Sequence, residues 1–290
     1  MKKIKILIPV FNDWESLSKL LSEINYQIKS FNHEFSIFII NDASTENKEI
    51  KIENLENIKS IKIIHKGENG GHTRCIALGL KYIYDYEEFD YVIPMDGDGE
   101  DRPQEIRHLI EHAEYSSSDT VVGERVKRSE NFIFKFCYNA HKVITLVFAG
   151  QNIRFGNFTC LSKTTVEKMI NEKATWSSFS GALTKVEKNR STIPSIRGTR
   201  YFGPSKMSFI NLIKHSLAII SVFKLQVLIR SILFLIIYSY LMFDHASVIT
   251  ILPLPLVVIM NFTIFNLSKR ENMKEFNDAL LDISKNEVLK

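Results

Sequence analysis

The sequence has few cysteines, and their spacing fits neither a metal site nor a redox site. Cys75, Cys137 and Cys160 are odd in number and widely separated in a chain of 290 residues. Disulfide frameworks and zinc sites use cysteines that recur at short, regular spacings. We therefore expect reduced thiols in a cytosolic compartment.

A strong excess of charge is also missing. The formal net charge is only +4, and the basic residues are scattered along the chain rather than gathered in bands. Proteins that bind nucleic acid usually present lysine and arginine clustered on one face. The composition therefore gives no argument for a nucleic-acid partner.

Several functional signatures are absent as well. The glycine turn Gly67–Gly71 follows neither the Walker A pattern nor G-x-G-x-x-G, so a P-loop or dinucleotide site is not supported. His65, His72 and His141 have no serine or cysteine nucleophile at a recognisable spacing, which argues against a hydrolase. We interpret these histidines as structural or surface residues. The apolar run of residues 4–10 is too short for a signal peptide and predicts a first strand.

An acidic turn is the most informative feature that is present. The apolar run Tyr91–Met95 predicts a buried strand, and Asp96, Asp98, Glu100 and Asp101 follow it directly. Carboxylates this close repel one another unless a cation neutralises them, and hard oxygen ligands suit Mg²⁺ or Mn²⁺. The alternative is a solvated acidic turn, which is a common surface feature.

Strands alternate with helices through the first hundred residues. Apolar runs predict strands, and amphipathic periodicity predicts helices between them; the strands are 5–10, 35–40, 61–65 and 91–95, and the helices 14–28 and 72–84. This alternation predicts an α/β fold with a mostly parallel sheet. Asp13, Asp42 and the acidic turn would then meet at one edge of the sheet, beside a glycine turn that opens a helix. A helix N-terminus there would favour a phosphate group.

Two long apolar runs follow. Leu225–Phe243 contains 19 residues with one charge, Arg230, and Ala246–Leu267 contains 22 residues with none. Each approaches the length that a helix needs to cross a bilayer, and only Asp244-His245 separates them. Lysines and arginines flank the pair on both outer sides, so the positive-inside rule places both ends in the cytoplasm. The alternative is a helical hairpin buried in a soluble core.

These features predict four parts of the chain. Residues 1–208 would form the catalytic domain, 225–268 two transmembrane helices, and 269–290 a cytoplasmic tail. Residues 209–224 have apolar positions at helical spacing. They predict a juxtamembrane amphipathic helix at the membrane interface, or equally an ordinary packed helix.

The motifs together resemble a known family. They are Ile8-Pro9-Val10-Phe11-Asn12-Asp13, Asn41-Asp42-Ala43-Ser44-Thr45, Asn69-Gly70-Gly71 and Met95-Asp96-Gly97-Asp98. In this order they resemble the nucleotide-sugar-binding motifs of family-2 glycosyltransferases with the GT-A fold. Arg200-Tyr201-Phe202-Gly203-Pro204-Ser205-Lys206, followed by an apolar hairpin, is similar to the polyprenyl-phosphate subgroup, which includes dolichol-phosphate mannose synthase.

The resemblance implies a donor pocket. Pro9, Phe11 and Asp13 would line the site of the nucleotide base, and Asp42 would hold uracil or ribose. Gly71 would lie at the phosphates. Asn41 departs from the family, which usually has an aspartate at this position, and the change puts base recognition in doubt.

The resemblance also implies a metal and phosphate site. Asp96, Asp98 and Glu100 would bind Mg²⁺ or Mn²⁺ with the diphosphate, and Asp98 would be catalytic; Glu100 stands where glutamine is common. Further residues would act on the phosphates. Arg125, Arg200 and Lys206 would be catalytic, and Ser205 would bind the donor. Pro204 is unusual before the Ser-Lys pair.

The resulting functional prediction is an inverting glycosyltransferase. It would move a sugar from a nucleotide sugar, with a UDP-sugar expected, to polyprenyl (undecaprenyl) phosphate at the cytoplasmic face of a bacterial inner membrane. The chain would cross this membrane more than once, and the family allows a homo-oligomer. Two alternatives stay open. One is an enzyme that elongates a polysaccharide or glycolipid, although the Gln-x-x-Arg-Trp motif of such enzymes is missing. The other is a catalytically disabled scaffold, because Asn41, Glu100 and Pro204 depart from the family pattern.

Overall fold

The computed structural model describes the chain except residues 49, 117, 119, 128–141 and 204–208. The chain divides into two compact units. The first consists of Met1–Ser129, Arg154–Lys206 and Asn272–Lys290, and the second of Glu130–Ile153 and Met207–Glu271. We describe each unit by itself.

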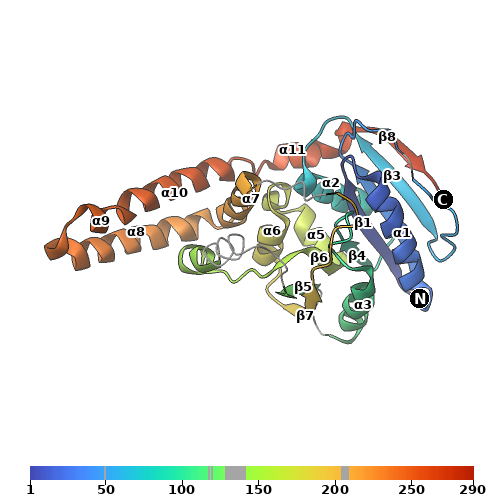
Figure 1. Cartoon of the computed structure of the whole chain (residues 1–290), viewed down its shortest axis with the longest axis horizontal. Helices are drawn as coiled ribbons and strands as arrows, with labels where there is room; N and C mark the ends of the chain where they lie inside the picture. The colour runs from blue at the N-terminus through green and yellow to red at the C-terminus, as the bar shows by residue number, and fades with distance from the viewer. Residues whose placement is uncertain (49, 117, 119, 128–141, 204–208) are drawn as a thin grey trace. The chain divides into compact units, whose positions relative to one another are not determined.

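The described part of the first unit is built on one eight-stranded sheet, with the order β7-β5-β6-β4-β1-β2-β3-β8 (Figure 1). The strands are β1 (Lys3–Val10), β2 (Glu34–Asn41), β3 (Ser60–Lys66), β4 (Tyr91–Pro94), β5 (Thr120–Lys127), β6 (Phe155–Ser162), β7 (Arg190–Ile196) and β8 (Ile283–Val288). Strands β1 to β4 pair in parallel, as predicted, whereas β6 and β8 pair antiparallel with their neighbours. The predicted α/β fold is confirmed, with a sheet that is mixed as a whole.

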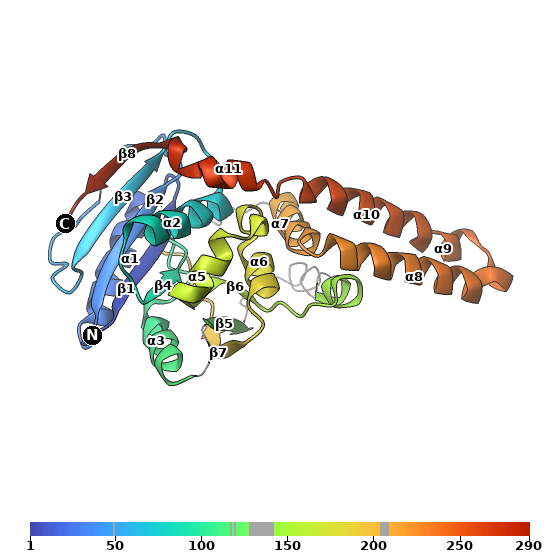
Figure 2. The ribbon, with the colours of Figure 1, turned by 180° about the vertical axis from the view of Figure 1, so that it is seen from behind.

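Helices cover both faces of the sheet. They are α1 (Trp14–Ile28), α2 (His72–Tyr86), α3 (Ile106–Tyr115), α5 (Lys163–Ile170), α6 (Phe179–Val186) and α11 (Met273–Asp278), with short 3₁₀ turns η1 (Pro103–Glu105), η3 (Lys173–Trp176) and η5 (Ala279–Asp282). Figures 1 and 2 show α1 on one face of the central strands and α2 on the other. Ile6 and Ile37 belong to the core that α1 completes, while Leu7 and Ile40 point toward α2. Two covered faces explain why these strands are apolar at nearly every position.

The end of the chain differs from the prediction. Residues 269–290 were expected to form a tail, but Asn272–Lys290 belongs to the unit that holds the sheet. Strand β8 pairs antiparallel with β3, and the amide of Leu289 donates to the carbonyl of Ile61 over 2.9 Å. This pairing satisfies the backbone groups that β3 would otherwise expose at an open edge.

The second unit is helical where it is described. Its elements are the π-helical turn η2 (Thr145–Ala149), α7 (Phe209–Ser221), α8 (Lys224–Met242), η4 (Phe243–His245), α9 (Val248–Ile251) and α10 (Pro253–Ser268). Helices α8 and α10 lie side by side (Figure 2), and Lys224 Nζ donates to Ser268 Oγ over 3.2 Å. The predicted domain boundary also differs here, because the described residues 142–153 group with this unit rather than with the sheet.

The apolar helices of the second unit are exposed. Two stretches, Lys224–His245 and Val248–Asp282, are long and apolar enough to cross a membrane, yet only 11% of the most apolar window of each is buried. Helices from a soluble core would bury most of such a surface. The described residues therefore do not support the buried-hairpin alternative, and the pair is a candidate membrane hairpin.

The path of the chain restricts how this hairpin can cross a membrane. The sheet contains strands that precede the apolar helices and strand β8, which follows them. Both ends of the apolar segment must therefore lie on the same side of any bilayer. An even number of crossings meets this condition, and a single crossing does not.

Gly79 tests the packing of α2 on the sheet. A Cβ atom at Gly79 would lie 2.3 Å from Leu7 Cδ1 and 3.1 Å from Ile40 Cγ1. We expect Gly79→Ala to lower the free energy of unfolding by about 1–3 kcal/mol through overpacking, despite the better helix propensity of alanine. Thermal unfolding of the purified chain measures this. Lys81→Ala, two residues along the same helix, is the control, and equal stability of both variants would contradict the packing argument.

Candidate active site

Four loops meet at one edge of the sheet. Strands β1, β2, β3 and β4 are parallel, so the segments after their carboxyl ends emerge together. Strand β1 lies between β2 and β4, where the direction of the strand order changes. Ligands of open α/β sheets bind at such a switch point. The fold thus gathers the predicted motifs around one place.

Asp96 lies at the centre of this edge. Its Oδ1 atom is 2.8 Å from Nε2 of His72, at the start of α2, and 3.4 Å from Nδ2 of Asn157, on β6. Its backbone amide donates to Oδ2 of Asp101 over 2.9 Å. Two elements that are distant in sequence, α2 and β6, therefore converge on the Asp96 carboxylate.

Arg200 joins two further acids. Its guanidinium donates to Asp98 Oδ2 over 2.9 Å and also to Asp13. Its Nε atom donates to the carbonyl of Phe202 over 2.8 Å, which fixes the orientation of the side chain. Arg200 therefore lies at the acidic turn, and its catalytic role stays a prediction.

The segment around Arg200 lies along the acidic turn. Arg197 forms an ion pair with Glu100, and the amide of Gly198 donates to the carbonyl of Glu100 over 2.8 Å. The ring of Tyr201 packs on Gly99, whose φ of +89° and close contact both require glycine. A Cβ atom at Gly99 would lie 2.4 Å from this ring.

The crowded carboxylates perturb one another. Burial raises the pKa of Asp101 to about 7, and the negative charge of Asp96 adds to this increase. Burial and Asp96 also raise the pKa of Asp98. Burial acts in the same direction on Asp96, but His72 and nearby arginines outweigh it and hold its pKa below the usual range. The site therefore needs positive charge to keep all of these groups ionised.

The chain supplies that charge itself in this conformation. The three acids predicted to bind metal are each paired with a basic side chain: Asp96 with His72, Asp98 with Arg200, and Glu100 with Arg197. Among the described residues, no group of three or more His, Cys, Asp or Glu is arranged to hold a metal ion. The donor set is nevertheless rich in carboxylate oxygens, which suits a hard divalent cation.

Asp42 points into the protein. It is 4% exposed, and its carboxylate accepts hydrogen bonds from Lys66 Nζ (2.7 Å) and from the amides of Gly70 and Gly71 (2.8 Å each). These contacts differ from the predicted role of holding uracil or ribose. Asp42 shapes the glycine turn, and Gly71, with φ of +87°, has open space where a Cβ would stand.

The remaining predicted residues are spread around the same edge. Pro9 is buried in the strand, whereas the Phe11 ring is 42% exposed. Arg125, on β5, lies close enough for its charge to lower the pKa of Asp96. Ser205 and Lys206 lie outside the described residues, as do Cys137 and His141.

The sequence analysis missed three residues at this site: His72, Asn157 and Arg197. His72 was interpreted as structural or at the surface, although its place directly after Gly70-Gly71 was a usable signal. Arg197 precedes Arg200 by three residues, so a search for basic residues near the predicted motif would have found it. Nothing local marks Asn157, because β6 joins the site only through the antiparallel pairing of the sheet.

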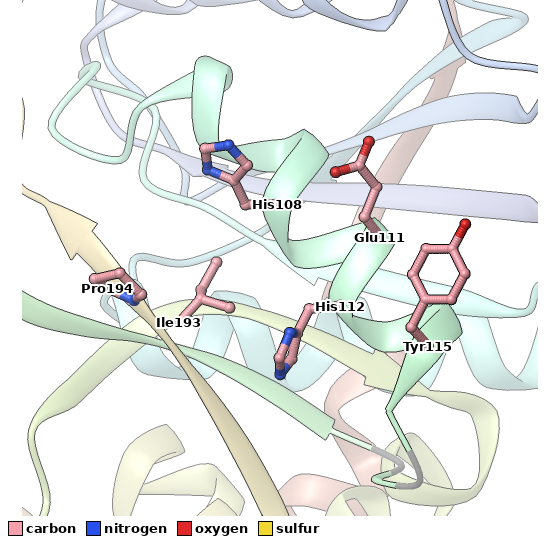
Figure 3. Close-up of a pocket in the computed structure, with 6 residues that line it drawn as sticks. All are labelled: His108, Glu111, His112, Tyr115, Ile193 and Pro194. Atoms are coloured by element: carbon pink, nitrogen blue, oxygen red, sulfur yellow. The ribbon is translucent and has the colours of Figure 1, made fainter.

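Two cavities occur in the described part of the first unit. One, of about 370 Å³, lies between α3 and β7 (Figure 3) and contains none of the predicted site residues; it is lined by His108, Glu111, His112, Tyr115, Ile193 and Pro194. The other, of about 470 Å³, lies between the glycine turn and the C-terminal segment, with Lys66, Gly70, Arg74, Trp176 and Glu275 among its lining residues.

Comparisons with known proteins agree with this architecture. Residues 5–178 match the sequence model described as Glycosyl transferase family 2, which is more than half of the chain. Glucosyl-3-phosphoglycerate synthase from Mycobacterium tuberculosis, solved with Mn²⁺, UDP and glucosyl-3-phosphoglycerate, is similar with a TM-score of 0.56 and 11% identity, covering 78% of this chain and 80% of that chain. Mannosyltransferase PcManGT from Pyrobaculum calidifontis, solved with GDP-Man and Mn²⁺, is similar with a TM-score of 0.53 and 13% identity, covering 96% of this chain and 75% of that chain. At these identities the structural similarity shows the fold alone.

Replacing Asp42 tests whether it stabilises the turn. Asp42→Ala would leave the Lys66 ammonium, with 3% of its side chain exposed, without its closest partner, which we expect to cost about 3–5 kcal/mol of folding free energy. Burial opposes ionisation of Asp42, but hydrogen bonds from Lys66 and Gly70 outweigh it and hold its pKa below the usual value. The stabilisation is therefore present above the pKa of an unfolded aspartate and is lost as the pH falls below it.

Denaturant titrations of Asp42→Ala at several pH values measure this contribution. Asp85→Ala, on the exposed side of α2, is the matched control for loss of a carboxylate. If Asp42→Ala is as stable as wild type, the carboxylate does not stabilise the turn, and a role in binding a ligand is favoured.

Proposed function

The chain belongs to glycosyl transferase family 2, and we propose that it transfers a sugar from a nucleotide-sugar donor to a polyprenyl phosphate at a membrane. The observation that carries the proposal is the path of the chain. The unit that contains most of the residues matched by the family model also contains the chain segments before and after the exposed apolar hairpin. A membrane hairpin would hold the catalytic unit next to a lipid acceptor, which supports this choice of acceptor.

The donor would bind along the edge where the four loops meet. Phe11 presents an exposed aromatic ring on which a base can stack. The open space beside Gly71, at the N-terminus of α2, suits a phosphate group. Similar proteins were solved with UDP or GDP-Man, which supports a nucleotide sugar but does not choose the base. We propose a UDP-sugar.

A divalent cation fits the acidic turn. Asp96, Asp98 and Glu100 would hold Mg²⁺ or Mn²⁺, and the crowding that raises the pKa of Asp98 would be relieved by its charge. When bound, the ion would stabilise the negative charge that develops on the leaving diphosphate. Arg200 and Arg197 would then be released from their carboxylates to contact the phosphates of the donor.

The reaction would be a single displacement with inversion at the anomeric carbon. An oxygen of the acceptor phosphate would form the new bond to this carbon as the bond to the nucleoside diphosphate breaks. The acceptor is already ionised at neutral pH, so a strong general base is unnecessary. Arg125 would orient the acceptor phosphate or the leaving group, and Arg200 would stabilise the leaving diphosphate. We place Ser205 and Lys206 at the same phosphates by resemblance alone.

The membrane hairpin would provide proximity. Holding the catalytic unit at the bilayer confines the search for a lipid acceptor to two dimensions. Lys224 at the start of α8 and Lys269 after α10 flank the apolar segment. We therefore propose that the catalytic unit lies in the cytoplasm of a bacterium and that residues 225–268 cross its inner membrane twice. Residues 209–224 would lie along the membrane surface.

A transfer assay tests this proposal. Full-length protein in membranes is mixed with undecaprenyl phosphate and a panel of radiolabelled UDP- and GDP-sugars, with and without EDTA. We expect one sugar to enter the lipid fraction and the transfer to stop with EDTA. Asp98→Asn should lower turnover at least about a hundredfold because it removes a charged metal ligand, whereas Asp85→Asn should not.

Two other results would redirect the assignment. Transfer to an oligosaccharide or glycolipid, but not to undecaprenyl phosphate, would favour an elongating enzyme. Nucleotide binding without transfer from any donor would favour a disabled scaffold, in which the ion pairs of the acidic turn persist.

Cysteine labelling tests the hairpin. His245→Cys lies in the turn between the apolar helices, and Ser284→Cys lies on β8. We expect a membrane-impermeant maleimide to label position 245 in cells with intact inner membranes, and position 284 only after lysis. Labelling of both positions from the same side would rule out the double crossing.

A further inference from the structure

The segment after the candidate membrane hairpin touches the donor side of the catalytic unit at two separate points. We propose that Asn272–Lys290 is a positioning element of the donor site, which acts through Glu275 on helix α2 and through Glu287 on the loops after β1 and β2. The inference rests on the proposed function, because it assigns a role in donor binding. It concerns residues outside the region that matches the family model, which ends at residue 178.

Glu275 clamps the first turn of α2. Its Oε2 atom accepts hydrogen bonds from Trp176 Nε1 and from the Arg74 guanidinium, each over 3.0 Å. Its Oε1 atom accepts from Asn272 Nδ2 over 2.9 Å, so both carboxylate oxygens are fixed. Arg74 is two residues after His72, the residue that contacts Asp96.

Aromatic stacking strengthens this clamp. The Trp176 ring stacks on Phe276 with ring centroids 5.5 Å apart and an angle of 19° between the planes. The Arg74 guanidinium lies 4.9 Å from the centre of the same Trp176 ring. Phe276 is fully buried, so α11 cannot shift without exposing apolar surface. The position of the α2 N-terminus is therefore tied to α11.

Glu287 acts through a chain of polar contacts. His65 Nδ1 is 2.9 Å from the Asn41 amide nitrogen, which can only donate, so Nδ1 must accept and Nε2 carries the hydrogen. Nε2 then donates to Glu287 Oε2 over 3.3 Å, and Lys48 pairs with the same carboxylate. Burial lowers the pKa of His65, which favours this neutral form.

The chain of contacts continues to the loop that carries Phe11. Asn41 Oδ1 accepts the amide of Ser44 over 3.0 Å, and Ser44 Oγ accepts the amide of Asn12 over 3.0 Å. Asn12 Oδ1 accepts the amide of Thr45 over 2.9 Å, which joins the two loops from the other side. Strand β8 thus holds the loop on which the base would stack.

This network also explains the departure at Asn41. An aspartate would offer only acceptor oxygens, so it would require the hydrogen of His65 on Nδ1, and Nε2 would then have no hydrogen to give to Glu287 unless the ring were charged. An asparagine donates to Nδ1 and leaves Nε2–H for β8. The Asn41 amide and the Glu287 carboxylate therefore both require the same neutral form of His65, with its hydrogen on Nε2.

Closing the edge of β3 would not by itself require these contacts. Backbone pairing between β8 and β3 needs neither Glu275 nor Glu287. Glu275 on α11 contacts Arg74 of α2, and Glu287 on β8 contacts Lys48 in the segment after β2. Their expected effect is on nucleotide affinity, because they preorganise loops that would otherwise have to be ordered on binding.

Nucleotide titration of the full-length protein tests the inference. UDP and GDP, each with Mn²⁺, are titrated calorimetrically into wild type, Glu275→Ala and Glu287→Ala. We expect each variant to bind the nucleotide about threefold to tenfold more weakly, from the loss of loop-ordering hydrogen bonds. Asp278→Ala on α11 and Asn286→Ala on β8 are matched controls and should stay within about twofold of wild type.

Enzyme kinetics and thermal unfolding distinguish a role in positioning the donor site from a role in stabilising the fold alone. We expect the donor KM to rise in the two variants while kcat changes less, with unfolding temperatures close to wild type. Glu275→Gln keeps one acceptor oxygen and should recover part of the affinity, and it also serves if the alanine variant folds poorly. A fall in unfolding temperature with unchanged nucleotide affinity would overturn the inference.

The outcomes also distinguish the inference from the proposed function. If wild type binds a nucleotide and all four alanine variants bind it equally well, the positioning role is wrong and the donor assignment stands. If wild type binds neither UDP nor GDP, the donor assignment fails and the positioning role fails with it.

Discussion

Mutual repulsion among carboxylates is the constraint on which this structure depends. Asp96, Asp98, Glu100 and Asp101 occur within six residues at the end of a central strand, and burial makes their charges costly. The chain offsets this cost with basic side chains from elsewhere in the fold. His72 comes from the start of α2, and Arg197 and Arg200 come from the segment after β7. The acidic turn therefore brings these segments together through its ion pairs.

The sheet provides the geometry that makes this convergence possible. Parallel strands place the loops after β1, β2, β3 and β4 at one edge, and helices on both faces explain why the strands are apolar at nearly every position. Asp42 shapes the same edge from inside, because its carboxylate accepts hydrogen bonds from the amides of Gly70 and Gly71 in the turn before α2. The buried carboxylate of Asp42 thus determines the conformation of the glycine turn.

The C-terminal segment links this site to the rest of the chain. It adds β8 to the sheet, stacks Phe276 on Trp176, and pairs Glu287 with Lys48 in the segment after β2. Because it follows the apolar helices, the hairpin is an insertion between two parts of one folded unit rather than an appendage at its end. A C-terminal truncation that removes the apolar helices would therefore also remove β8 from the sheet.

The sequence by itself determined the alternation of strands and helices, the acidic turn, the glycine turn and the apolar hairpin, because each is a local pattern of polarity or turn chemistry. It could not determine which basic residue meets which acid, since the partners are up to 187 residues apart. It also gave no sign of β8, whose residues Ile283–Val288 are mostly polar and become a strand only by pairing with β3. The burial of the Asp42 carboxylate and the hydrogen bond between Asn41 and His65 were likewise decided by the tertiary structure. The direction of a side chain depends on the neighbours that folding brings to it.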